Sequence, residues 1–280
     1  MGPVSHPHHA SHWIQEVVLA ARDPERLAAF YGAALGLTPE RSADAFVLRV
    51  APDAAHLLRI EHATRRAPQS RVPGLFHTAF LMPDRGALAS WLSYALGGEL
   101  PLVGASDHGV SEAIYLNDPE GNGIEVYADR PVATWHDRDG RLHMPSDRLD
   151  LHSVLAAETG SYDQAPRGLT LGHVHLSVPD LAAGEVWASR VGLDLTTRYP
   201  GASFLSWDGY HHHVAMNAWG MRGAEPRRIA GAPGLSEIVI GRTGAHKPRR
   251  NVDTLFGIEV SYRPAASADH APSPSNASAR

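Results

Sequence analysis

A unit of about 50 residues recurs along this chain, and no other feature of the sequence restricts the fold as strongly. In three places a run typical of a strand is followed by an Asp, by apolar residues at helical spacing, and by a glycine. Because Asp caps helix N-termini and glycine ends helices, each copy predicts a strand and then a helix. The shorter β-branched and aromatic runs that follow are typical of further strands. The first strands are expected at residues 15–19, 76–80 and 172–176.

A fourth copy begins at residues 235–240, but it reaches its last strand at 256–260 with no room for a full helix and middle strands. The sequence therefore predicts an α+β fold, in which strand–helix–strand–strand–strand modules pair into two half-barrel domains and the last module is truncated. The expected segments are a disordered arm (1–11), an N-terminal domain of two modules (12–131), a linker with a hairpin and a short helix (132–167), a C-terminal domain (168–264) and a disordered tail (265–280).

One position of the repeat carries a residue that can bind a metal in every copy. Seven residues before the helix-starting Asp stand Glu16, His77 and His173, and the strand pattern of the fourth copy puts Glu237 there. A single such residue is more often a polar group that faces water. Four of them at one repeat position favour a metal site.

The last strands of the second and fourth copies both read Gly-Ile-Glu-Val, with Glu125 and Glu259 between apolar neighbours. Alternation along a strand places each Glu on the face opposite its neighbours, inside the half-barrel. A buried carboxylate needs a cation, either a divalent metal or an Arg. In the third copy, the final strand is expected to begin at Tyr210 and to include His211–His213, and alternation predicts that His211 and His213 share a face, with at least one facing the same cavity as His173.

The composition limits the chemistry. The chain has no cysteine, so thiol nucleophiles, zinc–thiolate sites and iron–sulfur clusters are excluded, and any metal must be held by His, Asp or Glu. A net charge of -5 offers no basic surface for nucleic acid. The sequence has neither a membrane-spanning apolar run nor a secretion signal. We therefore expect a cytoplasmic protein that binds neither nucleic acid nor membranes.

Paired modules with His and Glu at these positions resemble the vicinal oxygen chelate superfamily, which includes glyoxalase I, fosfomycin and bleomycin resistance proteins and extradiol dioxygenases. The stretch from His108 through Tyr115 to Glu125 follows the extradiol dioxygenase signature, with Ser106 where the signature has a small or apolar residue. With residues 127–131 and 210–219, the chain is similar to two-domain bacterial catechol 2,3-dioxygenases.

The resemblance implies a ring-cleaving dioxygenase that acts on a catechol-like aromatic substrate with O2. In that family, two His and one Glu hold Fe(II). By position, His77 and Glu125 match two ligands, His108 matches a pocket histidine that moves protons, and Tyr115 matches a tyrosine that hydrogen-bonds the ring-opening intermediate. Proteins of the superfamily often associate, so a homo-oligomer is also expected.

The departure from the family is Glu16, which stands where a His ligand is expected. A set of Glu16, His77 and Glu125 is harder and more anionic, and would suit Mn(II) or another divalent metal as well as Fe(II). Because glyoxalase I-type sites use two Glu, an isomerase or thiol transferase is an alternative, as is a drug-binding protein without catalysis. Glu16 could also be no ligand at all. A second candidate set comprises His173, His213, Glu237 and Glu259, but the truncated fourth module favours the N-terminal site.

Overall fold

The computed structural model describes residues 5–243 and 252–264, and the expected modules are present in it. The first module contains β1 (His12–Ala21), α1 (Pro24–Leu35), β2 (Thr38–Ser42), β3 (Ala45–Arg49) and β4 (Leu58–His62). The second contains β5 (Gly74–Leu81), α2 (Arg85–Gly97), β6 (Leu102–Asp107), β7 (Ser111–Asn117) and β8 (Gly123–Asp129). The third contains β10 (Thr170–Ser177), α4 (Leu181–Arg190), β11 (Asp194–Tyr199), β12 (Ala202–Ser206) and β13 (Val214–Asn217). The described part of the fourth contains strands alone, namely β14 (Gly234–Arg242), β15 (Val252–Leu255) and β16 (Ile258–Pro264).

Local sequence explains where the helices begin. The carboxylates of Asp23, Asp84 and Asp180 each accept a hydrogen bond from the backbone N–H three residues later. These bonds satisfy N–H groups that a helix leaves unpaired at its first turn. At the other end of α1, Gly36 adopts a left-handed conformation with φ of 65°, which a residue with a side chain rarely adopts. The predicted capping is therefore confirmed.

The strands form two sheets, and the modules pair differently from the prediction. A seven-stranded sheet runs β15-β16-β14-β1-β4-β3-β2, and a nine-stranded sheet runs β11-β12-β13-β10-β5-β8-β7-β6-β9. The first strands meet antiparallel, β1 with β14 and β10 with β5. Modules one and four therefore form one sheet, here called the outer-module sheet, and modules two and three form the inner-module sheet.

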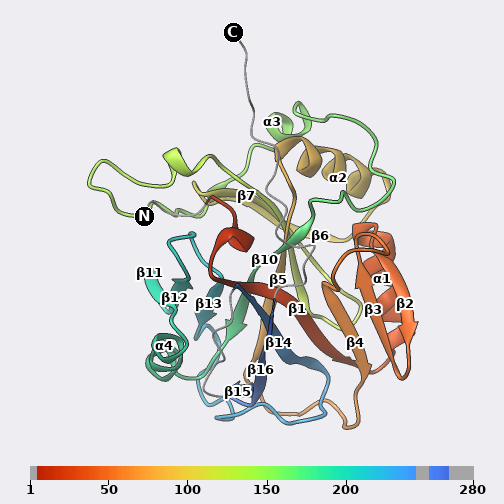
Figure 1. Ribbon diagram of the computed structural model, residues 1–280, viewed down its shortest axis with the longest axis vertical. Helices are drawn as coiled ribbons and strands as arrows, with labels where there is room; N and C mark the ends of the chain where they lie inside the picture. The colour runs from red at the N-terminus through yellow and green to blue at the C-terminus, as the bar shows by residue number, and fades with distance from the viewer. Residues whose placement is uncertain (1–4, 244–251, 265–280) are drawn as a thin grey trace.

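This arrangement corrects the expected division into domains 12–131 and 168–264. In Figure 1, β1 from the start of the chain lies beside β14 from its end. The repeat says that each first strand has an open edge, but it does not say which other first strand will pair with that edge. Both pairings join first strands antiparallel, so order along the chain does not decide the pairing.

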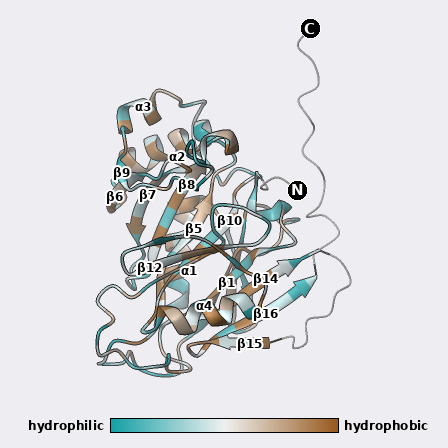
Figure 2. Ribbon diagram, turned by 90° about the vertical axis from the view of Figure 1, so that its left-hand side faces the viewer, coloured by the Kyte–Doolittle hydropathy of each residue, from teal (hydrophilic) through white to brown (hydrophobic). Residues whose placement is uncertain are grey.

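The core lies between the two sheets and under the helices. One large cluster of buried apolar side chains draws on both sheets and on α1, α2 and α4. Trp91 of α2 is fully buried in it and donates its indole N–H to the carbonyl oxygen of Ala34 in α1. Figure 2 shows hydrophobic residues concentrated on the helices and central strands. Among the described residues, no helix is long and apolar enough to cross a bilayer.

The N-terminal arm is more ordered than expected over residues 5–11. A short 3-10 helix, η1 (Pro7–His9), contacts β1 of one sheet and β10 of the other. Pro7 is buried, and His8 donates from Nε2 to the carbonyl oxygen of Leu171 at 3.1 Å. The prediction of a disordered arm is wrong for these residues, because η1 with Pro7 and His8 packs between β1 and β10. The predicted tail, 265–280, lies outside the described residues.

The expected linker has the expected hairpin and short helix, but it is also part of the inner-module sheet. It contains η2 (Val132–Thr134), a bridge between His136 and Leu142, β9 (Asp147–Arg148) and α3 (Leu151–Leu155). Because β9 pairs with β6, this segment extends the sheet at its edge. Its Met144, Pro145 and Ser146 line a pocket, which gives the segment a role in the site.

Candidate metal centre and its pocket

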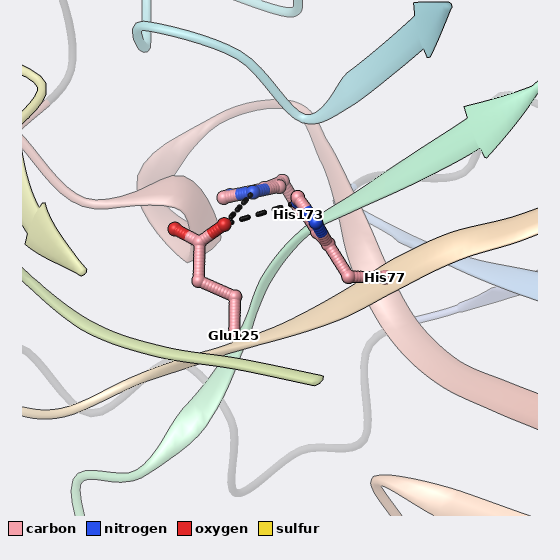
Figure 3. A group of neighbouring side chains, drawn as sticks. All are labelled: His77, Glu125 and His173. Carbon is pink, nitrogen blue, oxygen red and sulfur yellow. Dashed lines mark ion pairs between the residues drawn. The ribbon is translucent and has the colours of Figure 1, made fainter. Parts of the chain in front are cut away.

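Three buried side chains of the inner-module sheet meet at one point. They are His77 of β5, Glu125 of β8 and His173 of β10, and their ligand atoms all lie within 4.8 Å of one another. Glu125 Oε2 lies 3.0 Å from His77 Nε2 and 3.5 Å from His173 Nε2. Figure 3 shows the three side chains pointing toward one another from three strands. They can hold a metal ion together.

Strand register brings these three residues together. Thr78 lies opposite Val174 in the β5–β10 pair, so His77 and His173 stand on either side of this pair and on the same face of the sheet. In the parallel β5–β8 pair, Glu125 lies opposite Ala79, two residues beyond His77. Gly123 lies opposite His77, where an added Cβ would overlap the carbonyl oxygen of Phe76. Glycine therefore lets β8 approach β5 closely at the site.

The protonation state of the cluster suits a cation. Burial lowers the pKa of His173 to about 4, so this ring is neutral near pH 7. Burial alone would raise the pKa of Glu125, but the neighbouring His173 and His77 hold it well below its ordinary value. No Lys or Arg is among the described residues that line this pocket. The cluster therefore carries a buried negative charge, which a divalent ion would balance.

Two nitrogen atoms of the cluster lack partners. His77 Nε2 is near Glu125 but outside hydrogen-bonding geometry, and His173 Nδ1 is also buried without a hydrogen bond within the described part of the chain. Unpaired buried polar atoms are uncommon in native proteins and call for an explanation. For His77 Nε2, which faces Glu125, a divalent metal would supply that explanation.

A cavity of about 590 Å³ opens beside the three residues, and His108 and Tyr115 line it. His108 Nδ1 lies 2.9 Å from the carbonyl oxygen of Pro145, which can only accept, so Nδ1 carries the proton. His108 Nε2 then accepts from the Tyr115 hydroxyl at 2.7 Å. Burial and the charge of Glu125 raise the pKa of Tyr115 well above its ordinary value, so the hydroxyl keeps its proton near pH 7. The two predicted catalytic residues thus form one hydrogen-bonded pair at the pocket wall.

Two further histidines of the pocket were not singled out from the sequence. His175 follows His173 by two residues, so alternation along the strand already indicated that both face the cavity. Its Nε2 accepts a hydrogen bond of 3.0 Å from Asn217. The ring of His212 lies 4.1 Å from that of His173. Burial lowers the pKa values of His175 and His212 well below the ordinary value, so both rings are neutral.

The histidine triplet does not follow the predicted alternation, because its residues precede β13 and are not in a strand. His212 lines the pocket, whereas His213 points elsewhere and donates from Nε2 to the carbonyl oxygen of Pro7. His211 bonds to Asp129 through Nε2 and to His212 Nδ1 through Nδ1, at 2.9 Å and 2.7 Å. His213 therefore does not join the candidate ligand set.

The remaining predicted ligands lie in the outer-module sheet. Glu16 of β1 is 1% exposed and forms ion pairs with Arg59 at 3.1 Å and Arg263 at 2.6 Å. Glu237 of β14 also pairs with Arg59, at 2.7 Å, and Glu259 of β16 is exposed. Neither predicted set is assembled as proposed. His77 and Glu125 lie together as predicted, and His173 occupies the position predicted for Glu16. In the described part of the chain, Glu237 and Glu259 form no group with a histidine that could hold a metal ion.

Comparison with known proteins agrees with this geometry. A glyoxalase-like domain model matches residues 16–127. The chain is 37% identical over 217 residues to the catechol-2,3-dioxygenase of Bacillus subtilis (strain 168), and the match covers 75% of each protein. The identity and coverage are high enough to place the two proteins in one family.

Solved structures share the fold at much lower identity. A candidate dioxygenase from Bacillus subtilis subsp. subtilis str. 168 has a TM-score of 0.55 at 14% identity, with 84% of this chain and 71% of that chain covered. A mutant glyoxalase I from Zea mays has a TM-score of 0.52 at 13% identity, with 91% and 94% covered. These two structures support the architecture of two sheets built from paired modules.

Proposed function

Because this chain belongs to the vicinal oxygen chelate superfamily, in the family of the Bacillus subtilis catechol-2,3-dioxygenase, we propose that it is an extradiol dioxygenase. Its substrates would be a catechol-like aromatic compound and O2. The observation that carries the proposal is the cluster of His77, His173 and Glu125 at a pocket. Two histidines and one carboxylate that leave coordination positions open are typical of non-haem Fe(II) oxygenases. We therefore propose Fe(II) as the metal, with Mn(II) as the alternative.

When bound, the metal would supply adjacent coordination positions for the two catechol oxygens and for O2. The chain's own residues would hold the ring next to these positions. His77, His173 and Glu125 come from three neighbouring strands, so the sheet fixes their spacing without a mobile loop. Phe76 and Phe204 line the same pocket and offer aromatic faces for the substrate ring. The pocket would thereby orient the substrate before reaction.

Proton transfer falls to the His108–Tyr115 pair. A catechol must lose a proton to bind a metal through an ionised oxygen, and a neutral imidazole is a suitable acceptor of that proton near pH 7. Tyr115 can pass its hydroxyl proton to His108 Nε2, 2.7 Å away, and take one from the substrate. The same hydroxyl can donate a hydrogen bond to an oxygen that gains charge during ring opening.

The isomerase and thiol transferase alternatives rested on Glu16 as a second carboxylate ligand. Glu16 lies in the other sheet, between Arg59 and Arg263, so this reason for them disappears. A drug-binding protein without catalysis remains a distinct hypothesis. It predicts that a Glu125→Ala variant still binds its ligand, whereas the dioxygenase proposal predicts loss of metal-dependent binding.

The test is oxygen consumption by protein loaded anaerobically with Fe(II). We expect O2 uptake with catechols, together with a visible absorbance band from the ring-opened product. Hydroquinone serves as the control substrate, because its oxygens are not adjacent and cannot both reach one metal. Fe(II)-loaded protein that consumes no O2 with any of a panel of catechols would overturn the proposal.

A further inference from the structure

The pocket beside His77, Glu125 and His173 has a single acidic or basic side chain other than histidine and tyrosine among its described lining residues. Among the described residues that line it, Glu125 is the sole carboxylate, and there is no Lys or Arg. Nearby arginines are engaged elsewhere. Arg130 pairs with Asp107 and Glu112, and Arg71 donates to the carbonyl oxygen of Gly220, next to Trp219. The pocket therefore has no cation to receive an anionic part of a substrate.

Part of the pocket lining is apolar. We call Met144, Tyr199 and Phe204 the apolar wall, and Phe76, Val103 and Trp219 the apolar rim; all six line the cavity. The rim residues stay 44%, 61% and 47% exposed although they are large and hydrophobic. Exposed apolar side chains gathered at a cavity mouth mark a ligand-binding surface.

The wall and rim together draw on both modules of the inner-module sheet and on the segment that connects them. Val103 belongs to β6, Tyr199 to β11 and Phe204 to β12, and Met144 precedes β9. The Tyr199 hydroxyl donates to the carbonyl oxygen of Met144, which ties the connecting segment to β11 across the pocket. The apolar surface is thus part of the folded structure and does not depend on one mobile loop.

The cavity is also larger than one aromatic ring needs. Its volume of about 590 Å³ lies within the range of pockets that bury drug-sized ligands. A catechol ring against the three metal-binding residues would leave space along the wall and rim. A substituent on the ring would fill this space.

Charge and polarity together restrict that substituent. An ionised carboxylate placed along the wall would lose hydration without gaining a cationic side chain as partner. An alkyl or aryl group there would bury apolar area on both sides. We propose that this pocket selects catechols that carry an uncharged, apolar substituent and discriminates against catechols with an acidic side chain. This inference rests on the proposed ring cleavage and names its substrate class.

The test compares three catechols with substituents of similar length, namely 4-butylcatechol, 4-(3,4-dihydroxyphenyl)butanamide and 4-(3,4-dihydroxyphenyl)butanoate. We expect kcat/KM to be highest for the butyl compound and at least about tenfold lower for the butanoate, with the neutral amide between them. Anaerobic calorimetry on the Fe(II)-loaded protein should give the same order of affinity.

The outcomes separate the two proposals. Binding in the expected order without O2 uptake would refute ring cleavage and keep the pocket's preference. Ring cleavage with the butanoate equal to or better than the butyl compound would refute the preference and keep the activity.

A pair of variants examines the charge argument. Val103→Arg places a cation at the exposed rim and should raise the relative kcat/KM for the butanoate about fivefold. Val186→Arg is the matched control, because Val186 is 63% exposed on α4 and does not line the pocket. It should leave the ratio unchanged. An equal rise in both variants would mean that the overall charge of the protein, and not the rim, controls the preference.

Discussion

The inner-module and outer-module sheets are built from the same module, yet they neutralise buried carboxylates in opposite ways. In the inner-module sheet, Glu125 lies opposite Ala79, two residues beyond His77. In the outer-module sheet the same register position, opposite Val18 and two residues beyond Glu16, belongs to Arg59. The inner sheet thus has two histidines around a carboxylate, and the outer sheet has three carboxylates, Glu16, Glu61 and Glu237, around a guanidinium.

The difference shows that the residue at one strand position, Glu125 in one sheet and Arg59 in the other, decides how the buried charges are balanced. Arg59 pairs with both Glu16 and Glu237, so the outer cluster satisfies its own charges and is a structural part of the sheet. No Lys or Arg is among the described residues that line the pocket beside Glu125, so a cation from solution would balance the charge of the inner cluster. Similar backbone geometry therefore yields a closed ion-pair network in one sheet and a candidate metal site in the other.

The largest effect is expected from breaking the inner cluster. Glu125→Gln removes the only charged ligand and should lower metal affinity more than about hundredfold, because even outer partners of metal ligands contribute 10–100-fold. Metal analysis after dialysis measures this. Glu259→Gln, an exposed carboxylate of β16, should retain the metal content of the unaltered protein. Equal metal content in both variants would contradict the assignment of the inner cluster as the site.

The outer cluster is tested by Arg59→Met, which removes the ion pairs of Arg59 with Glu61, with Glu237 and with one oxygen of Glu16. Breaking a buried pair costs about 3–5 kcal/mol, and we expect about 2–4 kcal/mol here, since Arg263 still holds Glu16 and Arg59 is partly exposed. Denaturant unfolding measures the free energy of unfolding. The metal content should not change. Arg167→Met breaks the exposed pair with Asp53 and should have no measurable effect. Unaltered stability of Arg59→Met would show that the outer carboxylates do not need this arginine.

The two sheets also differ in the residue that lies opposite Glu125 in one and opposite Arg59 in the other. Tyr115 lies opposite Glu125, and its counterpart opposite Arg59 is Val47. Tyr115→Phe removes the hydrogen bond to His108, so kcat for catechol cleavage should fall about 10–100-fold while metal content stays constant. Tyr94→Phe is the control, because the Tyr94 hydroxyl donates to Ala33, outside the pocket. A drop in metal content for Tyr115→Phe would instead assign Tyr115 a role in holding the metal.

The smallest effect is expected at His8, whose hydrogen bond to Leu171 joins the N-terminal arm to β10. Burial lowers the pKa of His8 to about 3 from an ordinary 6.5, so its contribution to stability is present above pH 6.5 and is lost as the pH falls toward 3. Each pH unit in that window should cost about 1.4 kcal/mol. Between pH 6.5 and 5, the free energy of unfolding should therefore fall less steeply with decreasing pH in His8→Gln than in the unaltered protein. The exposed-residue variant His136→Gln should show the same slope as the unaltered protein. Parallel pH profiles for His8→Gln and the unaltered protein would contradict a buried, neutral His8.

Much of this molecule follows from local sequence. The helix starts at Asp23, Asp84 and Asp180 are predictable because an N-cap needs only its own first turn. His77 and Glu125 are predictable as neighbours because both belong to one module, whose first and last strands lie side by side. The His108–Tyr115 pair is also local, since both residues flank the turn between β6 and β7.

The third ligand depended on the tertiary structure. The sequence by itself determined four equivalent first strands, with Glu at 16 and 237 and His at 77 and 173. Pairing of β5 with β10 brought the two histidines together, and pairing of β1 with β14 brought the two glutamates to Arg59. No local rule chooses among equivalent strand edges, because each offers the same backbone hydrogen bonds. Only packing of the whole chain, which buries one shared core between the sheets, decided that His173 and not Glu16 lies beside His77 and Glu125 in the candidate metal site.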